Sequence, residues 1–485
     1  MSSACASLSS RCAAPLRRLS PSLLSPRARS LSSSADGPIG AASRPFLELE
    51  DRFGSHNYHP IPVVLSRGLG VHVWDVDGCQ YLDCLSAYSA VNQGHCHPRL
   101  VAAMARQASR LTLSSRAFCS DQLGPYAKQL TTLMGYDRVL PMNTGAEGTE
   151  TALKLARRWG YDVKGVPANR ATVLVASGAF HGRTIAAISA SDDPESYGGF
   201  GPLMPGLTKV PFGDLGALRR ALAADPTIVA FMVEPVQGEA GVVVPPAGYL
   251  AGAAAACRAA GALFIADEVQ TGLCRTGRML ATQWEGACVC ARGSGESSGC
   301  VCARPDILVL GKALSGGMLP VSAVLADDAV MLCIRPGQHG STFGGNPLAC
   351  AVASEALAVL TDEGLAANAD ARGEQLRAGL RALARDFPTL LSPAVRGRGL
   401  LCAVEVRADA ADAAGAPISA WDLCIGLKDA RAVHGAPLGL LAKPTHGTII
   451  RLAPPLVITQ EQVQLALEVM RTVCDRLLQG KGRAA

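Results

Sequence analysis

The amino-acid sequence predicts an α/β protein built around a mostly parallel β-sheet. Short, continuous apolar runs recur in the middle of the chain, at 172–176, 228–233, 262–266, 307–310 and 321–325. Most of these runs are separated by segments of helix length, such as 214–224 and 249–261. Apolar runs that alternate with helices are typical of strands buried on both faces of a sheet. In such sheets, ligands bind beyond the carboxyl ends of the strands.

The chain of 485 residues is long enough for one large and one smaller domain. In its C-terminal part, helical stretches around 364–387 precede two apolar segments, 395–406 and 448–458. A final helix is predicted from Thr459, where Gln462 completes a capping box. We therefore expect a leader, an N-terminal segment that packs with the small domain, a large cofactor-binding domain and a small C-terminal domain, at residues 1–35, 36–95, 96–345 and 346–485.

The leader differs in composition from the rest of the chain. It contains no lysine and no acidic residue but five arginines: Arg11, Arg17, Arg18, Arg27 and Arg29. It is also rich in serine and alanine and lacks the long apolar core of a secretory signal, so it is predicted to be a mitochondrial transit peptide. Without these five arginines, the 45 basic residues become 40 and match the 40 acidic ones. The net charge therefore does not indicate nucleic-acid binding, and we expect a protein of the mitochondrial matrix.

No stretch of the sequence predicts a membrane span. The longest uncharged segment, 240–257, contains prolines and glycines and consists mostly of small residues. The 17 cysteines follow no disulfide spacing, and a matrix enzyme would keep them reduced. We expect small-molecule substrates, with neither nucleic acid nor a membrane as partner.

Polar and aromatic side chains follow four of the predicted strands, at the point where each strand ends. In chain order they are Phe180 and Arg183, Glu234 and Glu239, Asp267 and Gln270, and Lys312. Because the carboxyl ends of parallel strands meet at one edge, these side chains are expected to converge. Taken alone, Lys312 would be an ordinary strand-end lysine, since lysines are rarely buried without a partner. The convergence of these side chains instead indicates a catalytic or binding site at this edge.

Lys312 and Asp267 have the side chains that pyridoxal phosphate requires. A lysine amine bonds the aldehyde of this cofactor, and a carboxylate keeps its pyridine nitrogen protonated so that the ring accepts electrons. Asp267 could instead cap a following helix. A phosphate cradle is predicted at 143–159, where Asn143 or Thr144 can cap a helix whose N-terminal amides favour an anion.

Longer motifs extend this pattern across the chain. The run LFIADEVQTGLCRTG is followed by DILVLGKALSGG, and other distinctive runs are GSHNYHPIPVVLSRG, SAYSAVNQGHCHP, VLPMNTGAE, FMVEPVQGEAGVVVP, HGSTFGGNPLAC and LLAKPTHGTIIRLAPPLVI. From about Ser55 to Gln479, the chain resembles the class III aminotransferases, which are pyridoxal-phosphate enzymes of fold type I. The last six motifs are most similar to the members that act on ornithine.

The resemblance implies a reaction as well as a fold. The δ-amino group of L-ornithine would pass to 2-oxoglutarate, giving glutamate and glutamate 5-semialdehyde, which cyclises to pyrroline-5-carboxylate. It also implies a homodimer or a higher oligomer of dimers. On the cofactor side, Lys312 would bond the aldehyde and carry protons during catalysis, and Asp267 would pair with the pyridinium nitrogen.

The resemblance implies five further cofactor contacts: stacking on the ring, a hydrogen bond to the phenolic oxygen, two backbone amides at the phosphate, and a hydroxyl that reaches the phosphate of the neighbouring subunit. These contacts belong, in that order, to Phe180, Gln270, Gly145, Ala146 and Thr342. The last contact is the one that makes the site dependent on a dimer. Phe180 could otherwise be core packing, and the Thr342 hydroxyl could belong to an ordinary turn.

On the substrate side, the resemblance implies that Glu239 masks Arg451 while ornithine is bound, so that the δ-amine reaches the cofactor. When 2-oxoglutarate binds, its α-carboxylate would take Arg451, and Glu239 would move aside. Arg183 would hold the distal carboxylate by a bidentate pair. Tyr58 and Tyr88 would line the ornithine end, with Tyr58 near the α-amino group. The alternatives without a substrate role are a surface turn at Arg183 and structural packing of the two tyrosines.

The sequence departs from the family pattern at several places. His181 stands where tryptophan is expected, which changes the pocket wall, and the run 146–150 alters the first turn of the phosphate helix. The segment 286–304 is an insertion with a repeated CVCAR motif, whose two Cys-x-Cys pairs are Cys288, Cys290, Cys300 and Cys302. Its Gly/Ser-rich composition favours a surface insertion over a zinc site, so no metal is expected. A second small insertion lies near 431–437.

Three alternatives to the ornithine reaction remain open from the sequence. The nearest is an acetylornithine or another ω-amino acid aminotransferase, against which Tyr58, Tyr88 and the segment 441–447 argue. The second is a protein that binds the cofactor without catalysis. The third is a metal-responsive interaction protein that acts through the cysteine insertion.

Overall fold

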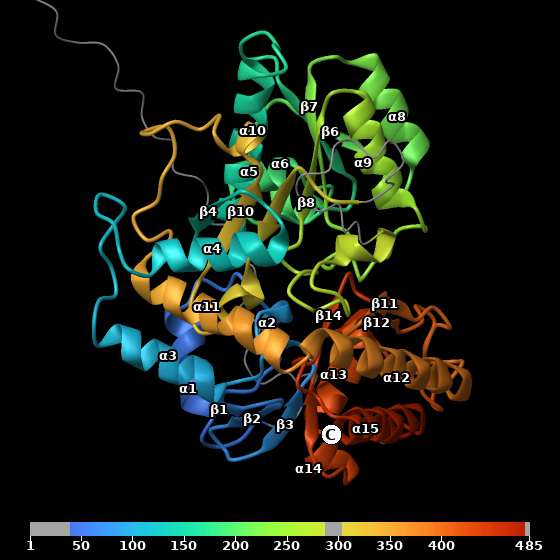
Figure 1. Cartoon of the computed structure of the whole chain (residues 1–485). Helices are drawn as coiled ribbons and strands as arrows, with labels where there is room; N and C mark the ends of the chain where they lie inside the picture. The colour runs from blue at the N-terminus through green and yellow to red at the C-terminus, as the bar shows by residue number, and fades with distance from the viewer. Residues whose placement is uncertain (1–38, 287–302, 481–485) are drawn as a thin grey trace, which may run out of the picture.

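The computed structural model describes residues 39–286 and 303–480 (Figure 1). The predicted transit peptide, and with it most of the insertion 286–304 including Cys288, Cys290, Cys300 and Cys302, lies outside the described residues. In the described part of the chain, no helix combines the length and the apolar character needed to cross a membrane. Within the same ranges, no group of three or more histidine, cysteine or acidic side chains is arranged to hold a metal ion.

A seven-stranded sheet, here called the central sheet, forms the middle layer, in the order β4-β10-β9-β8-β7-β5-β6. Its strands, in chain order, are β4 (Arg138–Met142), β5 (Thr172–Ala176), β6 (Leu207–Val210), β7 (Ile228–Val233), β8 (Leu263–Asp267), β9 (Ile307–Leu310) and β10 (Ser322–Ala326). All pairs from β6 to β9 are parallel, whereas β10 is antiparallel to both of its neighbours. The predicted mostly parallel α/β sheet is therefore confirmed, and the last of the five apolar runs is its reversed strand.

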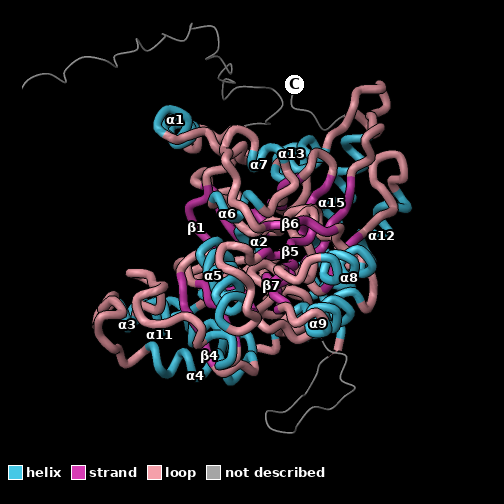
Figure 2. The backbone as a smooth tube through the Cα atoms, turned by 90° about the horizontal axis from the view of Figure 1, so that it is seen from above, coloured by secondary structure: helices cyan, strands magenta, loops and turns pink. Residues whose placement is uncertain are grey.

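Helices cover both faces of the central sheet, as Figure 2 shows for α5 on one side and α8 and α9 on the other. The helix α5 (Gly145–Asp162) buries its apolar stripe against alternate residues of the strands. The opposite face is covered by α8 (Leu215–Ala224) and α9 (Tyr249–Ala259) and, towards β9 and β10, by α4 (Leu123–Met134) and α11 (Pro347–Asp362). Because both faces are covered, the inner strands β7, β8, β9 and β10 are buried throughout, which explains their continuous apolar runs.

A second sheet, here called the C-terminal sheet, has the order β11-β12-β15-β14. Its strands are β11 (Arg396–Arg398), β12 (Leu401–Glu405), β14 (Lys443–Thr445) and β15 (Ile449–Leu452), and the helices of the same region are α12 (Leu365–Asp386), α13 (Ala420–Lys428), α14 (Ala430–His434) and α15 (Gln460–Leu478). The predicted capping box of the last helix is present: the Thr459 side chain accepts from the Gln462 amide, and the Gln462 side chain accepts from the Thr459 amide.

The N-terminal strands share a third sheet with a strand from the end of the chain. In this sheet β1 (Leu65–Leu69), β2 (His72–Asp75) and β3 (Gln80–Asp83) form an antiparallel run, and β13 (Gly439–Leu441) adds to β3 in parallel. The blue and red parts of the chain therefore lie side by side in Figure 1. Three further helices belong to the first part of the chain: α1 (Arg44–Phe53), α2 (Ser86–Ser89) and α3 (Pro98–Ala108).

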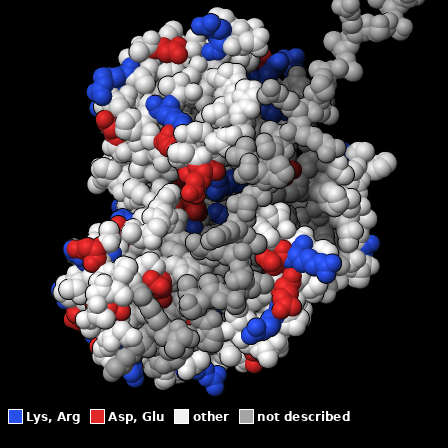
Figure 3. Space-filling model, turned by 180° about the vertical axis from the view of Figure 1, so that it is seen from behind, with Lys and Arg blue, Asp and Glu red and all other residues white. Residues whose placement is uncertain are grey.

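The surface seen in Figure 3 carries lysine, arginine and acidic side chains interspersed, without a continuous basic area on that face. This mixture agrees with the equal numbers of basic and acidic residues outside the leader.

Candidate functional site

A cavity of about 190 Å³ lies at the carboxyl edge of the central sheet. Its lining residues come from the segments that follow β4, β5, β7, β8 and β9: Gly145, Ala146, Phe180, His181, Gly182, Glu234, Asp267, Val269, Gln270 and Lys312. Every residue predicted to contact the cofactor, apart from Thr342, is in this set. The structure thus brings together the side chains that follow the strand ends, as the sequence predicted.

Lys312 reaches the cavity from the short 3₁₀ turn η4 (Lys312–Ser315), directly after β9 and Gly311. Its φ of +46° lies in the left-handed region, which costs a residue with a Cβ atom roughly 1–2 kcal/mol. Burial lowers the pKa of the Lys312 amine, against the opposing effect of the Asp267 and Glu234 carboxylates. A lysine with a lowered pKa has a larger neutral fraction, and the neutral amine is the nucleophile.

Asp267, the last residue of β8, pairs with His181 inside the cavity wall. The His181 Nδ1–H donates to Asp267 Oδ2 over 2.7 Å, and the two side chains are 0% and 5% exposed. Burial of the imidazole disfavours its charged form, but the hydrogen bond to Asp267, with the charges of Asp267 and Glu234, outweighs burial and raises the pKa of His181. The result is a buried carboxylate that is held in place and supported by a neighbouring proton donor.

Asp267 does not cap a helix, which was the alternative left open by the sequence. The segment 268–280 forms turns, and Asp267 Oδ1 accepts from the Val269 amide over 3.0 Å. Glu268 closes these turns, because its carboxylate accepts from the backbone amides of Ala281 and Thr282. The turns return the chain to η3 (Ala281–Glu285) and leave Asp267 directed into the site.

Glu234 is a second buried carboxylate in the wall. It accepts from the Phe180 amide over 2.9 Å and from the Gly238 amide over 3.3 Å. Burial raises the pKa of Glu234 to about 7, with His181 opposing the shift and Asp267 adding to it. Its two hydrogen bonds tie the segment with Phe180 to the loop after β7, so it fixes the shape of the wall.

The start of α5 has the capped helix N-terminus on which the predicted anion cradle depends. Thr144, rather than Asn143, is the cap: its Oγ1 accepts from the Glu147 amide, and the Glu147 carboxylate accepts from the Thr144 amide over 2.8 Å. The unusual run 146–150 therefore gives a regular first turn, because it places Glu147 in a capping box. Gly145, the first residue of the helix, lies within this box and lines the cavity, where the helix N-terminus favours a phosphate.

Gln270 has a buried side-chain oxygen, Oε1, without a hydrogen-bond partner in the part of the chain that the structure describes. Gly238 makes room for it, because a Cβ atom at Gly238 would lie 1.3 Å from Gln270 Oε1. The His181 Nε2 atom is likewise buried without a partner among residues 39–286 and 303–480. Together with the lysine, the carboxylate and the helix N-terminus, these polar atoms fit the pyridoxal phosphate that the sequence predicts.

Arg451 and Glu239 form an ion pair beside this cavity. Arg451 is a buried residue of β15, and its Nη1 lies 2.8 Å from Glu239 Oε2. The Thr445 hydroxyl donates to Glu239 Oε1 over 3.3 Å. The Arg451 guanidinium also lies over the Tyr88 ring, 5.0 Å from its centroid. The arginine that the resemblance assigns to carboxylate binding is therefore covered by a carboxylate of the chain itself.

The two predicted tyrosines lie near this ion pair but differ in burial. Tyr88 has a φ of +60° and lines the Arg451 side chain, and burial raises the pKa of its hydroxyl. Tyr58 is 70% exposed, and the Lys443 ammonium lies 5.6 Å from its ring centroid. Lys443 thereby belongs to the surroundings of the ion pair.

Two predicted site residues, Arg183 and Thr342, belong neither to the cavity lining nor to the group around the Arg451–Glu239 ion pair. Arg183 is exposed, donates to Ser196 Oγ over 2.6 Å and lies 5.3 Å over the Phe180 ring. Thr342 is exposed on the loop before α11. Its neighbour Ser341 accepts from the Asn143 side chain over 2.9 Å, which places the loop close to the start of α5.

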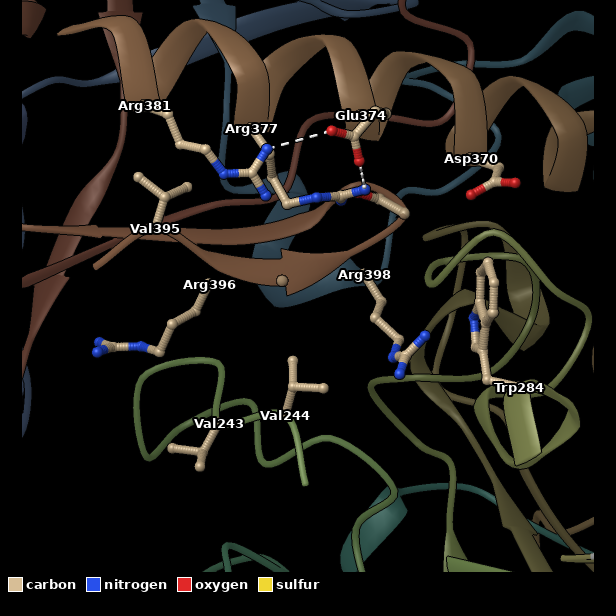
Figure 4. Close-up of a pocket in the computed structure, with 12 residues that line it drawn as sticks. Val243, Val244, Trp284, Asp370, Glu374, Arg377, Arg381, Val395, Arg396 and Arg398 are labelled. Atoms are coloured by element: carbon tan, nitrogen blue, oxygen red, sulfur yellow. Dashed lines mark hydrogen bonds and ion pairs between the residues drawn. The ribbon is translucent and has the colours of Figure 1, made fainter. Parts of the chain in front are cut away.

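A second, larger cavity of about 560 Å³ lies between α12, β11 and the loop at Val243 (Figure 4). Four arginines and two acidic residues belong to its lining: Arg377, Arg381, Arg396, Arg398, Asp370 and Glu374. None of the predicted cofactor or substrate residues lines it, and it offers no lysine, so it is not the candidate site. It does matter for the site in one respect, because the Arg396 Nε donates to the Gly241 carbonyl and so holds the loop that carries Glu239.

The sequence did not predict the contacts made by three side chains: His181, Glu234 and Lys443. His181 was noticed only as a departure from the family, and its hydrogen bond to Asp267 joins residues 86 positions apart. Glu234 was seen at a strand end without a role. Lys443 was noticed only within a motif, because its relation to Arg451 depends on strand pairing. The order of residues in the chain carries no direct signal for such contacts.

Comparisons with known proteins agree with this geometry. A family model described as Aminotransferase class-III matches residues 53–474. The Rattus norvegicus protein named ornithine aminotransferase, mitochondrial, is 53% identical over 429 residues, which cover 88% of this chain and 90% of that protein. The solved structure of the ornithine aminotransferase from Toxoplasma gondii ME49 has a TM-score of 0.81 and 45% identity, with 90% of this chain and 96% of that chain covered.

A second solved structure belongs to the acetylornithine aminotransferase from Elizabethkingia anophelis. Its TM-score is 0.75 and its sequence identity is 47%, with 90% of this chain and 100% of that chain covered. Since the family model and the relatives span most of the sequence, and the residues at the sheet edge fit the cofactor, the chain belongs to the class III aminotransferases.

Proposed function

We propose that this chain transfers the δ-amino group of L-ornithine to 2-oxoglutarate, giving glutamate 5-semialdehyde, which closes to pyrroline-5-carboxylate, and glutamate. The observation that carries the proposal is the ion pair between Arg451 and Glu239. An open arginine beside the cofactor would bind an α-carboxylate and present the α-amine. With Arg451 covered, a diamine is free to present its distal amine instead. The names of the rat and Toxoplasma relatives support the same activity.

The cofactor is pyridoxal 5'-phosphate, and its contacts are proposed from the cavity. When bound, it supplies an aldehyde that accepts amino groups and a ring that withdraws electrons. Lys312 would hold the aldehyde end and Asp267, supported by His181, the ring nitrogen. Four further residues would hold the ring face, the phenolic oxygen and the phosphate: Phe180, Gln270, Gly145 and Ala146.

In catalysis, the lowered pKa of the Lys312 amine would suit it to move a proton between the δ-carbon of ornithine and the aldehyde carbon of the cofactor. Its buried position excludes bulk water from that transfer. Asp267 stays in a fixed position, because the His181 Nδ1–H holds its carboxylate within the wall. These residues act on proton transfer, whereas Arg451 and Glu239 act on the choice of substrate.

For the second substrate, we propose that the α-carboxylate of 2-oxoglutarate replaces Glu239 on Arg451. Arg183 would take the distal carboxylate, since a planar guanidinium binds a carboxylate by two parallel hydrogen bonds. That role requires Arg183 to release Ser196 and turn towards the cavity. Tyr58 and Tyr88 would contact the α-end of ornithine, near the ion pair.

The decisive experiment compares ornithine with N-acetylornithine as amino donors for 2-oxoglutarate. The relative named acetylornithine aminotransferase makes this the nearest rival. We expect ornithine to be preferred by at least tenfold in kcat/KM, and a preference for N-acetylornithine would overturn the proposal. Lys312→Ala should abolish turnover and the visible absorption of the lysine-bound cofactor. Retention of that absorption would mean that another lysine is the anchor.

We further propose a homodimer in which the partner's copy of the 339–343 loop completes the phosphate site through Thr342, and a location in the mitochondrial matrix. The leader composition and the word mitochondrial in the names of relatives support that location. A fusion of residues 1–40 to a fluorescent protein should enter mitochondria. Thr342→Ala should weaken cofactor binding in a dimer that remains intact by light scattering.

A further inference from the structure

Three basic side chains lie in one row across the C-terminal sheet. Strand pairing sets Lys443 opposite Arg451, Arg451 opposite Ala403, and Ala403 opposite Arg396. Residues that are directly opposite on neighbouring strands point to the same face, and the strands are about 4.8 Å apart. Lys443 and Arg451 are therefore adjacent on that face, with Arg396 two strands further along.

The loop after β7 lies across this row. Glu239 contacts Arg451 at 2.8 Å, and two residues later the Gly241 carbonyl accepts from Arg396 Nε over 3.0 Å. On the other side, the Thr445 hydroxyl is within 3.3 Å of both the backbone oxygen and Oε1 of Glu239. Because Thr445 is two residues from Lys443 in one strand, both side chains point to the same face. Glu239 thus lies on the face that carries Lys443.

Lys443 has no carboxylate in ion-pair contact among the residues that the structure describes, although it is half-buried. Its ammonium lies over the Tyr58 ring instead. Burial lowers the pKa of the Lys443 amine, and the charge of Glu239 opposes that shift. Lys443 is thus a half-buried cation near Glu239, the carboxylate that is expected to leave Arg451 when 2-oxoglutarate binds.

We propose that Lys443 is the second partner of Glu239: it receives the Glu239 carboxylate when the α-carboxylate of 2-oxoglutarate takes Arg451. This inference rests on the proposed function, since it concerns the exchange of anions on Arg451. With Lys443, the two cations and the two carboxylates form a neutral group. Without it, two carboxylates would share one arginine and repel each other. Lys443 is therefore a specificity-determining residue for the second substrate, not for ornithine.

The test is Lys443→Met in the cofactor-loaded enzyme, because methionine keeps an unbranched stem and removes the charge. We expect the KM for 2-oxoglutarate to rise roughly two- to fivefold, as for a partly exposed charge pair, while the KM for ornithine stays nearly unchanged. Binding of glutarate, an unreactive dicarboxylate, should weaken by the same factor in calorimetry. Lys443→Arg should restore most of the affinity. Lys128→Met, on the exposed face of α4, is the matched control.

A double mutant separates a specific partnership from a general attraction for anions. In a Glu239→Gln background, Lys443→Met should have no further effect on glutarate binding, because there is no carboxylate to receive. An equal loss of glutarate affinity in both backgrounds, or an unchanged affinity in the single mutant, would overturn the inference. If the unmodified enzyme fails to convert ornithine and 2-oxoglutarate, the proposed function fails instead, while the glutarate measurement still reads the Lys443–Glu239 coupling.

Discussion

Replacing His181 by phenylalanine removes the only side chain that donates to Asp267 in the described structure. Both partners are almost fully buried, so solvent cannot replace the lost hydrogen bond. A hydrogen bond to a charged group contributes about 1.5–3 kcal/mol, and an unsatisfied buried carboxylate adds a desolvation cost. Because Asp267 keeps the Val269 amide, we expect a loss of about 2 kcal/mol in the free energy of unfolding of the cofactor-free protein.

The pH dependence gives this prediction a second readout. The pKa of His181 is raised in the folded protein above the value of about 6.5 for an unfolded histidine. A group with a raised folded pKa stabilises fully below its unfolded pKa, and that contribution is lost as the pH rises through the folded pKa. The difference in stability between the natural protein and His181→Phe should therefore be largest near pH 6 and should narrow towards pH 9.

Urea unfolding of the cofactor-free protein, followed by tryptophan fluorescence at several pH values, measures both effects. His181→Asn is the matched variant, because its side-chain amide can donate from nearly the position of the imidazole Nδ1. It should recover part of the stability without the pH dependence. Equal stability of His181→Phe and the natural protein at pH 6 would refute the view that His181 supports Asp267.

Three further predictions concern the loop after β7 and the cradle. Glu239→Gln uncovers Arg451, so the half-reaction with glutamate should gain on that with ornithine by roughly tenfold in kcat/KM, as expected for one partly buried charge pair; an unchanged ratio would mean that the ion pair does not control selection. Gly238→Ala drives a Cβ into the place of the Gln270 amide and should weaken cofactor binding at least tenfold in a titration, while a Gln270→Ala change in the same protein should relieve most of the steric strain. Thr144→Ala removes the cap of α5 and should lower the free energy of unfolding by about 1 kcal/mol, measured in urea; no loss would show that the capping box is dispensable.

Five of the seven strands of the central sheet could be predicted from the sequence, because they are buried on both faces and so consist of continuous apolar residues. The edge strands β4 and β6 were not among the predicted runs, since each keeps exposed residues. The reversal of β10 could not, since an apolar run contains no information on strand direction. The turns after Asp267 were also unpredictable. They are held by the Glu268 carboxylate, whose partners are backbone amides 13 and 14 residues away.

For the site, the strand-end rule placed Lys312, Asp267 and Gln270 at one edge without any coordinates. It could not pair His181 with Asp267, because that contact depends on how two neighbouring loops fold. It also gave no reason to connect Lys443 with Glu239. That connection needs the register of β14 on β15 and the docking of a loop from another sheet, which are properties of the tertiary structure.

The cavity at the edge of the central sheet and the Arg451–Glu239 ion pair are built by different layers of the molecule. The cavity residues all follow strands of the central sheet, whereas Arg451, Lys443 and Thr445 stand on the C-terminal sheet. The short stretch from Glu239 to Gly241 contacts both Arg451 and Arg396 of that sheet. We therefore expect substitutions at residues 239–241 to alter which amine is accepted without changing the residues that line the cavity. With this division, changes in a few contacts are enough to change the amine substrate of such an enzyme during evolution.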